Sequence, residues 1–165
     1  MFSYFAHLVC TKCGTQYERD RRLNLCPAAG CAGSLFARYH PRPLDREAFA
    51  SRPRSMWRWH EMMPVEDPAH VVTLGEGDTP LLAATRLSSA FGFADLWIKD
   101  EANNPTGSFK ARGLSAAVSR AKELGISQIA LPTAGNAGGA AAAYAARGGL
   151  ECHVFMPADT PEVFR

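Results

Sequence analysis

The sequence has no long apolar run and almost no net charge. No uninterrupted hydrophobic stretch approaches the ~18 residues that a membrane-spanning helix needs, which argues against a membrane segment. Lys and Arg number 18 and Asp and Glu 16, so the net charge of +2 is too small to indicate that the chain as a whole binds nucleic acid or a membrane. The first residues also lack the basic start of a secretory signal. We therefore expect a cytoplasmic protein without nucleic-acid or membrane partners.

Cysteine is scarce after residue 31, where only Cys152 occurs. Its apolar neighbours predict a small, buried side chain in a strand. The other cysteines form a C-x2-C pair and a C-x4-C pair separated by twelve residues: Cys10, Cys13, Cys26 and Cys31. Four thiolates at such spacing predict a structural Zn²⁺ site with a filled coordination shell. Two disulfides are the alternative, but disulfides persist only in an oxidising compartment.

Charge and proline divide the chain into parts. Residues 1–60 hold 10 basic and 4 acidic side chains, whereas residues 61–165 hold 8 basic and 12 acidic ones. Six of the 11 prolines lie within residues 41–80, where they interrupt regular structure. We predict a zinc-ribbon-like module over residues 1–40, a proline-rich linker over 41–74 and the first part of an α/β domain over 75–165.

One segment of the predicted linker, residues 56–63, contains two tryptophans. The sequence MWRWHEMM (56–63) predicts a short helix. Trp57 and Trp59 are large apolar side chains with a polar N–H, so we expect them to anchor this helix to a neighbouring element rather than to bind a ligand.

From residue 94 onward, strand and helix patterns alternate. We predict strands over 94–101, 127–134 and 151–157, with helices over 111–125 and 137–149 between them. This order predicts a parallel sheet with right-handed crossovers and with both faces covered. The sequence stops at Arg165, where a further helix begins, so we expect the chain to be a fragment of a larger α/β protein.

Two loops follow predicted strands at the end of the sheet where α/β proteins bind ligands. The first, NNPTGSFKARG (103–113), places Lys110 at the start of a helix, where the helix dipole and the second cation, Arg112, favour an uncharged amine that can attack a carbonyl. An exposed surface lysine is the alternative. The second loop, TAGNAGGA (133–140), suits an anion held by backbone N–H groups, or else a tight strand–helix turn. It matches neither nucleotide-binding glycine motif, so no nucleotide is implied.

Three motifs together resemble one enzyme family. GEGDTPL (75–81), NPTGSFKARG (104–113) and TAGNAGGA (133–140), in this order, are similar to the first half of the fold-type II pyridoxal-phosphate enzymes, whose fold is that of the tryptophan synthase β chain. With the N-terminal cysteines, the pattern is most similar to the threonine synthases. The resemblance implies a lyase with pyridoxal 5′-phosphate as cofactor, a small amino-acid substrate, a homodimer when full length, and conversion of O-phosphohomoserine and water to threonine and phosphate.

The resemblance also implies roles for particular residues. Lys110 would hold the cofactor and act as the catalytic base, and Asn136 would contact the cofactor's ring hydroxyl. The loop that holds the substrate carboxylate would consist of Thr133, Gly135, Asn136 and Ala137.

Two alternative functions remain open from the sequence. Ala111 follows the lysine where many threonine synthases have Asp, and the resulting K-A-R is typical of threonine and serine dehydratases. The basic first 60 residues could instead belong to a zinc-ribbon module that binds nucleic acid or protein, although no set of aromatic stacking residues accompanies the basic ones.

Overall fold

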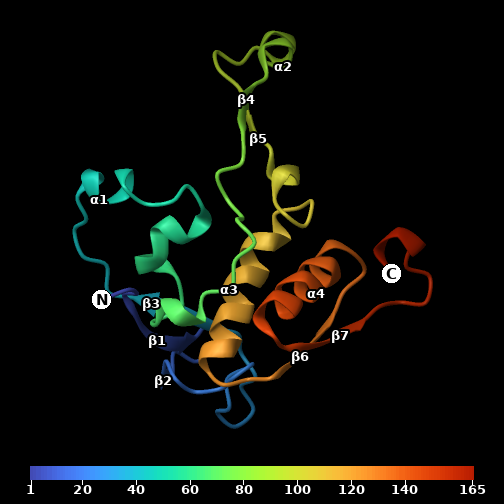
Figure 1. Cartoon of the computed structure of the whole chain (residues 1–165). Helices are drawn as coiled ribbons and strands as arrows, with labels where there is room; N and C mark the ends of the chain where they lie inside the picture. The colour runs from blue at the N-terminus through green and yellow to red at the C-terminus, as the bar shows by residue number, and fades with distance from the viewer.

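The structure, a computed structural model, describes residues 1–165 (Figure 1). Its N-terminal part is a three-stranded antiparallel sheet in the order β2-β1-β3. The central strand β1 (Phe5–Cys10) pairs with β2 (Gln16–Glu18) and with β3 (Leu35–Tyr39). Both ends of β1 are buried, at Phe5 and Cys10, so the sheet packs through its middle strand.

Residues 41–74, the predicted linker, contain short helical segments: α1 (Arg46–Ala50) and 3-10 segments over Met56–Met62 and Pro68–His70. The predicted helix at 56–63 is thus confirmed as a 3-10 segment. Trp57 is buried in it and anchors it as expected. Trp59 is 49% exposed and is a weaker anchor: its ring packs against that of Phe49 in α1, with 4.5 Å between ring centroids, and the guanidinium of Arg58 lies 5.5 Å from its centroid.

A projecting arm follows the linker. It consists of β4 (Leu81–Ala83), α2 (Thr85–Phe91) and β5 (Trp97–Lys99), and it extends from the body of the molecule (Figure 1). The sequence predicts β5 as the first strand of a parallel sheet, and this is wrong: β5 pairs antiparallel with β4, from Leu81 opposite Lys99 to Ala83 opposite Trp97. The short spacing between the two strands allows a local antiparallel pairing, whereas a parallel partner needs a crossover.

The parallel part of the fold follows the predicted order. After a 3-10 turn at Glu101–Asn103 come α3 (Lys110–Glu123), β6 (Gln128–Pro132), α4 (Asn136–Gly148) and β7 (Glu151–Phe155), with a last 3-10 turn at Glu162–Phe164. β6 and β7 pair in parallel, as a crossover through α4 requires. The strand and helix predictions for this region are confirmed within a few residues, and the fold is mixed α/β as expected.

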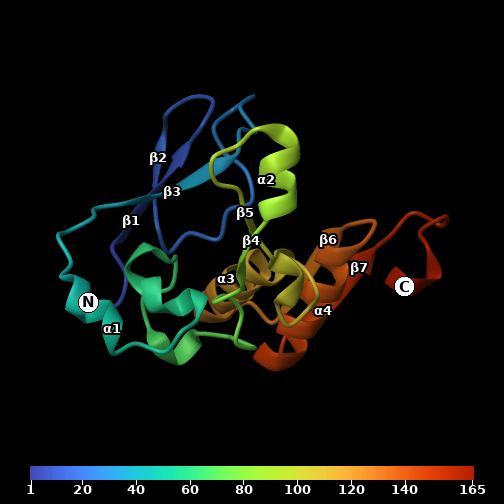
Figure 2. The same cartoon turned by 90° about the horizontal axis from the view of Figure 1, so that it is seen from above.

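The largest core cluster lies between α3 and α4 and consists of Val72, Ala111, Val118, Ala140, Tyr144, Ala145 and Leu150. α3 and α4 pack against each other (Figures 1 and 2), and the small alanine side chains between them allow a close approach. Tyr144 is the largest fully buried side chain of the cluster. Cys152 packs against this cluster from β7, as predicted, and its burial raises the pKa of the thiol. No helix of the structure has the length and apolarity needed to cross a membrane.

Candidate functional site

Lys110 is the first residue of α3, at the positive end of the helix dipole. Its backbone N–H donates to the hydroxyl of Ser108 at 3.3 Å, and its amine lies 4.2 Å from the ring centroid of Phe109. The side chain is half-buried, and no ion pair of the structure involves it. A partly exposed amine that forms no ion pair is accessible to a carbonyl compound.

The loop before Lys110 is held by buried polar side chains. The amide oxygen of Asn104 accepts from the backbone N–H of Gly77 at 3.1 Å, and its nitrogen donates to a carboxylate oxygen of Glu101 at 3.0 Å. Asn104 and Ser108 are buried. The hydroxyl of Thr106 is also shielded from solvent, and it has no hydrogen-bond partner. A shielded hydroxyl without a partner, close to the lysine, fits a loop that contacts a polar group such as a cofactor phosphate or a substrate.

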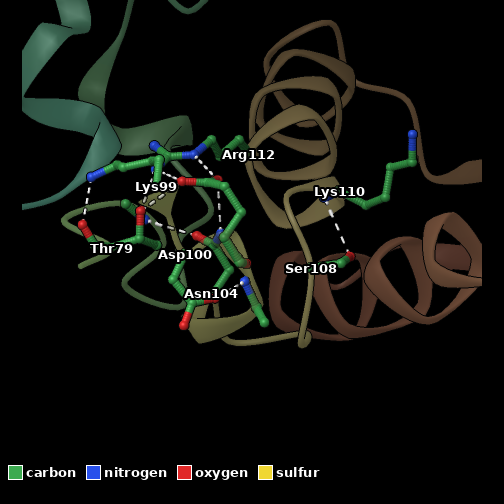
Figure 3. Close-up of polar contacts among 10 residues, drawn as sticks. Thr79, Lys99, Asp100, Asn104, Ser108, Lys110 and Arg112 are labelled. Carbon is green, nitrogen blue, oxygen red and sulfur yellow. Dashed lines mark hydrogen bonds and ion pairs between the residues drawn. The ribbon is translucent and has the colours of Figure 1, made fainter. Parts of the chain in front are cut away.

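Arg112 does not act on Lys110 as the sequence predicts. Its guanidinium binds Glu101 through two hydrogen bonds of 2.6 and 2.8 Å, and the two side chains, Arg112 and Lys110, leave α3 in opposite directions (Figure 3). The hydroxyl of Thr79 donates to the same carboxylate at 2.6 Å. The hydrogen bonds from Arg112, then those from Thr79 and Asn104, lower the pKa of Glu101 to about 2. Arg112 therefore fixes the start of α3 to the GEGDTPL segment rather than adding a free positive charge.

The second loop joins β6 to α4. The backbone N–H of Thr133 donates to Phe155 O at 2.9 Å, and its hydroxyl accepts from the N–H of Gly135 at 3.2 Å. Asn136 is the first residue of α4 and is exposed, and Ala137 follows it within the first turn. The four residues predicted to hold a carboxylate thus form one continuous turn at a helix N-terminus.

The two loops lie at the same end of the helical layer. α3 and α4 pack against each other, and both begin at the end nearer the β4–β5 arm (Figure 1). The unpaired N–H groups of both first turns therefore face the same region, where they favour negatively charged groups. A phosphate and a carboxylate on one bound molecule suit this arrangement, so the residues present fit a pyridoxal-phosphate site.

The four N-terminal cysteines also converge. Their sulfur atoms all lie within 4.8 Å of one another, with 3.5 Å between Cys10 and Cys31 and 3.6 Å between Cys13 and Cys26. Tetrahedral zinc with ~2.3 Å bonds separates its ligand sulfurs by about 3.8 Å, whereas a disulfide needs about 2.05 Å. All five cysteines are free thiols in the structure. The donor set therefore fits a metal ion better than it fits two disulfides.

Three details of the cysteine cluster agree with a metal site. The backbone N–H groups of Lys12 and Cys13 point at the sulfur of Cys10, at 3.4 and 3.5 Å. Hydrogen bonds with Thr15 lower the pKa of Cys13 to about 6. A Cβ at Gly33 would lie 2.7 Å from the sulfur of Cys10, so the chain leaves room for sulfur there only because this residue is glycine. The thiolate form that metals bind is thus favoured at part of the cluster.

Sequence reasoning missed several polar residues around the lysine. Glu101, Thr79 and Asn104 form a network with Arg112, and Glu76 is fully buried beside α3. Glu76 and Thr79 belong to the GEGDTPL motif, and an acidic side chain placed between two glycines was the available signal.

Comparisons with known proteins point to one enzyme family. The family described as "Pyridoxal-phosphate dependent enzyme" matches residues 72–165. The threonine synthase of Methanocaldococcus jannaschii is 36% identical over 149 residues, which is 90% of this chain and 37% of that protein. That of Methanosarcina acetivorans is 36% identical over 152 residues, or 92% of this chain and 37% of that protein. That of Halalkalibacterium halodurans is 45% identical over 108 residues, or 62% of this chain and 30% of that protein. The matched part of the chain thus spans between 30% and 37% of the length of these relatives.

Proposed function

The chain belongs to the pyridoxal-phosphate dependent enzymes, and from this we propose that the whole protein is a lyase that converts O-phosphohomoserine and water to threonine and phosphate. The observation that carries the proposal is the 36% identity to threonine synthases over about nine-tenths of the chain. The identity reaches across the cysteine-containing part as well as the α/β part, because 152 of the 165 residues are covered. We propose the cytoplasm as the location of the enzyme.

Lys110 is the residue that we propose for cofactor attachment and proton transfer. When bound, pyridoxal phosphate supplies an electron sink for chemistry at the Cα of an amino acid. The amine of Lys110 would hold the cofactor, would be displaced by the amine of the substrate, and would then carry protons at Cα and Cβ. Its accessible amine and its place on the first turn of a rigid, 14-residue helix support this role.

The turn between β6 and α4 is our candidate for substrate binding. We propose that Thr133, Gly135, Asn136 and Ala137 hold the substrate carboxylate, with Asn136 also contacting the ring hydroxyl of the cofactor. Backbone N–H groups at the start of a helix bind anions without a charged side chain. The shielded hydroxyl of Thr106, which has no hydrogen-bond partner, belongs to the loop before Lys110. We propose it as a further polar contact for the bound molecule.

We propose that the four cysteines hold one structural Zn²⁺ ion in a zinc-ribbon-like module over residues 1–40. A linker over 41–74 and the first part of the catalytic domain over 75–165 complete the proposed organisation. The sulfur–sulfur distances and the antiparallel strands beside the cluster support this assignment. All four ligands are protein thiolates, so the ion would stabilise the fold and would take no part in the reaction.

A threonine or serine dehydratase is the second candidate, because of the K-A-R sequence at Lys110. In the structure, Ala111 is fully buried in the core between α3 and α4. An aspartate at this position would bury a carboxylate without a partner, so the packing of α3 explains the alanine without reference to the substrate.

The test is product analysis with the whole protein and its cofactor. We expect phosphate and threonine to be formed from O-phosphohomoserine in equal amounts, and both to be lost in Lys110→Ala. Formation of a 2-oxo acid from threonine, with no release of phosphate from O-phosphohomoserine, would identify a dehydratase instead. A homodimer is expected for the whole protein and is checked by sedimentation.

A further inference from the structure

Glu76 of the GEGDTPL motif is fully buried, with 0% of its surface exposed. A buried carboxylate is costly unless hydrogen bonds satisfy both of its oxygens. No arginine, lysine or histidine pairs with it in the structure. Its hydrogen-bond donors are all neutral groups, and Arg112 acts on it only through space.

The two oxygens of Glu76 are satisfied by donors from several elements. Oε1 accepts from Trp57 Nε1 at 2.9 Å and from the Ser115 hydroxyl at 2.6 Å. Oε2 accepts from the Tyr144 hydroxyl at 2.6 Å, the Leu74 N–H at 3.1 Å and the Thr73 hydroxyl at 3.2 Å. Burial by itself raises the pKa of Glu76, but the bonds from Ser115 and Tyr144 outweigh it, so the pKa lies below its ordinary value. The group is ionised at neutral pH.

The hydrogen-bond donors around Glu76 suit a carboxylate better than an amide. Hydroxyl groups can turn and accept a hydrogen bond, but the indole N–H of Trp57 and the backbone N–H of Leu74 can only donate. One of them faces Oε1 and the other faces Oε2. A glutamine would place its NH₂ group against one of these donors in either orientation, and only the indole N–H of Trp57 has a second acceptor, the Ser115 hydroxyl at 2.9 Å. The site is built for a negative charge rather than for any polar side chain of this size.

The position of Glu76 links the two helices of the proposed active site. Ser115 lies on α3, one turn after Lys110, and Tyr144 lies on α4, which begins at Asn136. Trp57, which also donates to Glu76, lies in the 3-10 segment Met56–Met62 of the linker. The backbone N–H of Met56 in the same segment donates to the backbone oxygen of Glu76 at 2.8 Å. These segments are far apart in sequence, so their common partner fixes how they are placed relative to one another.

Glu76 also lies beside the loop that precedes Lys110. The N–H of Gly77 donates to Asn104, which anchors that loop. A Cβ at Gly77 would lie 2.4 Å from the backbone nitrogen of Met56, so the segment has no room to shift toward the linker. The segment that carries Glu76 is therefore joined by a hydrogen bond to the loop before Lys110 and is closely packed against the linker segment.

We propose that Glu76 is a positioning residue for the lyase reaction, and that its buried carboxylate sets the placement of the starts of α3 and α4, and so of Lys110 and the carboxylate-binding turn. The expected effect of Glu76 on turnover rests on the proposed function. Its expected effect on local structure does not. Glu76 touches neither substrate nor cofactor in this account. Its side chain acts through Trp57, Ser115 and Tyr144, and the neighbouring Gly77 binds Asn104.

The test compares Glu76→Gln with the wild type in the whole protein with pyridoxal phosphate bound. We expect kcat for phosphate release to fall about tenfold to a hundredfold with a smaller change in KM, because a misplacement of ~1 Å costs rates of this order. The visible absorbance of the bound cofactor should change as well. In the cofactor-free protein, hydrogen–deuterium exchange should rise in peptides that cover residues 104–114.

Glu123→Gln is the matched control. Glu123 lies at the other end of α3 and accepts from the backbone N–H groups of Glu66 and Asp67 at 2.8 and 2.7 Å, so its loss also removes a shielded carboxylate. We expect it to lower thermal stability while kcat, cofactor absorbance and exchange at 104–114 stay at wild-type values. Wild-type kcat, absorbance and exchange in Glu76→Gln would overturn the proposal.

Tyr144→Phe decides the matter if Glu76→Gln does not fold, since it removes one donor and keeps the ring. A folded Tyr144→Phe protein should show a several-fold lower kcat and faster exchange at 104–114; wild-type values of both would contradict the proposal. If the wild-type protein releases no phosphate, the proposed function has failed, and exchange at 104–114 in these variants still tests the role of Glu76 by itself.

Discussion

Glu101 and Glu76 are carboxylates that lie near Lys110 in different surroundings. Glu76 is fully buried among neutral donors, whereas the side chain of Glu101 is 25% exposed and pairs with Arg112. Both hold the GEGDTPL segment to α3, through Ser115 and Arg112 respectively. The start of α3 is therefore fixed from two sides, which gives the lysine a defined place.

The ion pair at Glu101 predicts a pH-dependent contribution to stability. The pKa of Glu101 is lowered to about 2, so the folded state favours the ionised form, and this stabilisation is present above the unfolded pKa near 4.5 and is lost as the pH falls from there toward 2. Glu101→Gln should lower the free energy of unfolding by about 2 kcal/mol at pH 7, and by much less near pH 3. Urea denaturation at both pH values measures this. Glu162→Gln, at an exposed position, should change neither value, and an equal loss at pH 3 and pH 7 for Glu101→Gln would contradict the account.

Some of the residues at the site can be predicted from sequence and others cannot. Lys110 and the four cysteines stand in short motifs whose spacing carries their chemistry. Glu76 and its partners Ser115 and Tyr144 are 39 and 68 residues apart in the chain, and no local pattern indicates that they meet. Arg112 was assigned to the wrong partner for the same reason, because Glu101 reaches it only when the turn before α3 has formed.

At the scale of elements, the helices and strands with clear periodicity were predictable and the short ones were not. α3, α4, β6 and β7 have regular apolar spacing and glycine at their ends, such as Gly125, whose φ of +67° follows α3. β4 and β5 are three residues long and exposed on both faces, so neither carries the alternation that reveals a strand and its partner.

The first turn of α4 requires glycine at position 138. A Cβ there would lie 2.8 Å from the end of Met156, 2.9 Å from a methyl group of Thr133 and 3.0 Å from one of Val154. Gly138→Ala should therefore lower the free energy of unfolding by about 1–3 kcal/mol. Gly139→Ala is the control, since nothing lies within 4 Å of its added Cβ, and it should be neutral or stabilising. Urea denaturation of both variants tests the close packing; equal stability would show that this turn is not tightly packed.

The cysteine cluster predicts a metal requirement for the N-terminal sheet. One Zn²⁺ per chain should be found by mass spectrometry under native conditions, and a strong chelator should unfold β1–β3, seen as loss of protection from hydrogen exchange over residues 5–39. Cys13→Ser should lower the zinc content, whereas Cys152→Ser, on the other side of the fold, should leave it unchanged. A full zinc content in Cys13→Ser, or none in the wild type, would contradict the assignment.

At the scale of the whole molecule, the apolar surface is uneven. The β4–α2–β5 arm carries many of the exposed large apolar side chains: Leu81, Leu82, Leu87, Phe91, Phe93, Trp97 and Ile98. So many exposed large apolar side chains on one small element are unusual on a monomer. The arm thus differs from the body of the fold, where the alanines, Val118 and Tyr144 between α3 and α4 are shielded.

This surface predicts self-association of the 165-residue chain. Its sedimentation coefficient should rise with concentration, because pairing of two arms removes apolar surface from water. Phe91→Ser combined with Phe93→Ser should weaken the association. Val163→Ser, which removes an 86% exposed side chain outside the arm, should not. A concentration-independent monomer would show that the arm does not drive association.

Lys110 is the proposed site of covalent cofactor attachment in the whole protein. Borohydride reduction of the protein loaded with pyridoxal phosphate, followed by proteolysis and mass spectrometry, locates the modified residue. We expect one label per chain, on the peptide that contains SFKAR, and no label in Lys110→Ala. A label on another lysine, such as Lys99 or Lys122, or no label on a folded and loaded protein, would contradict the account.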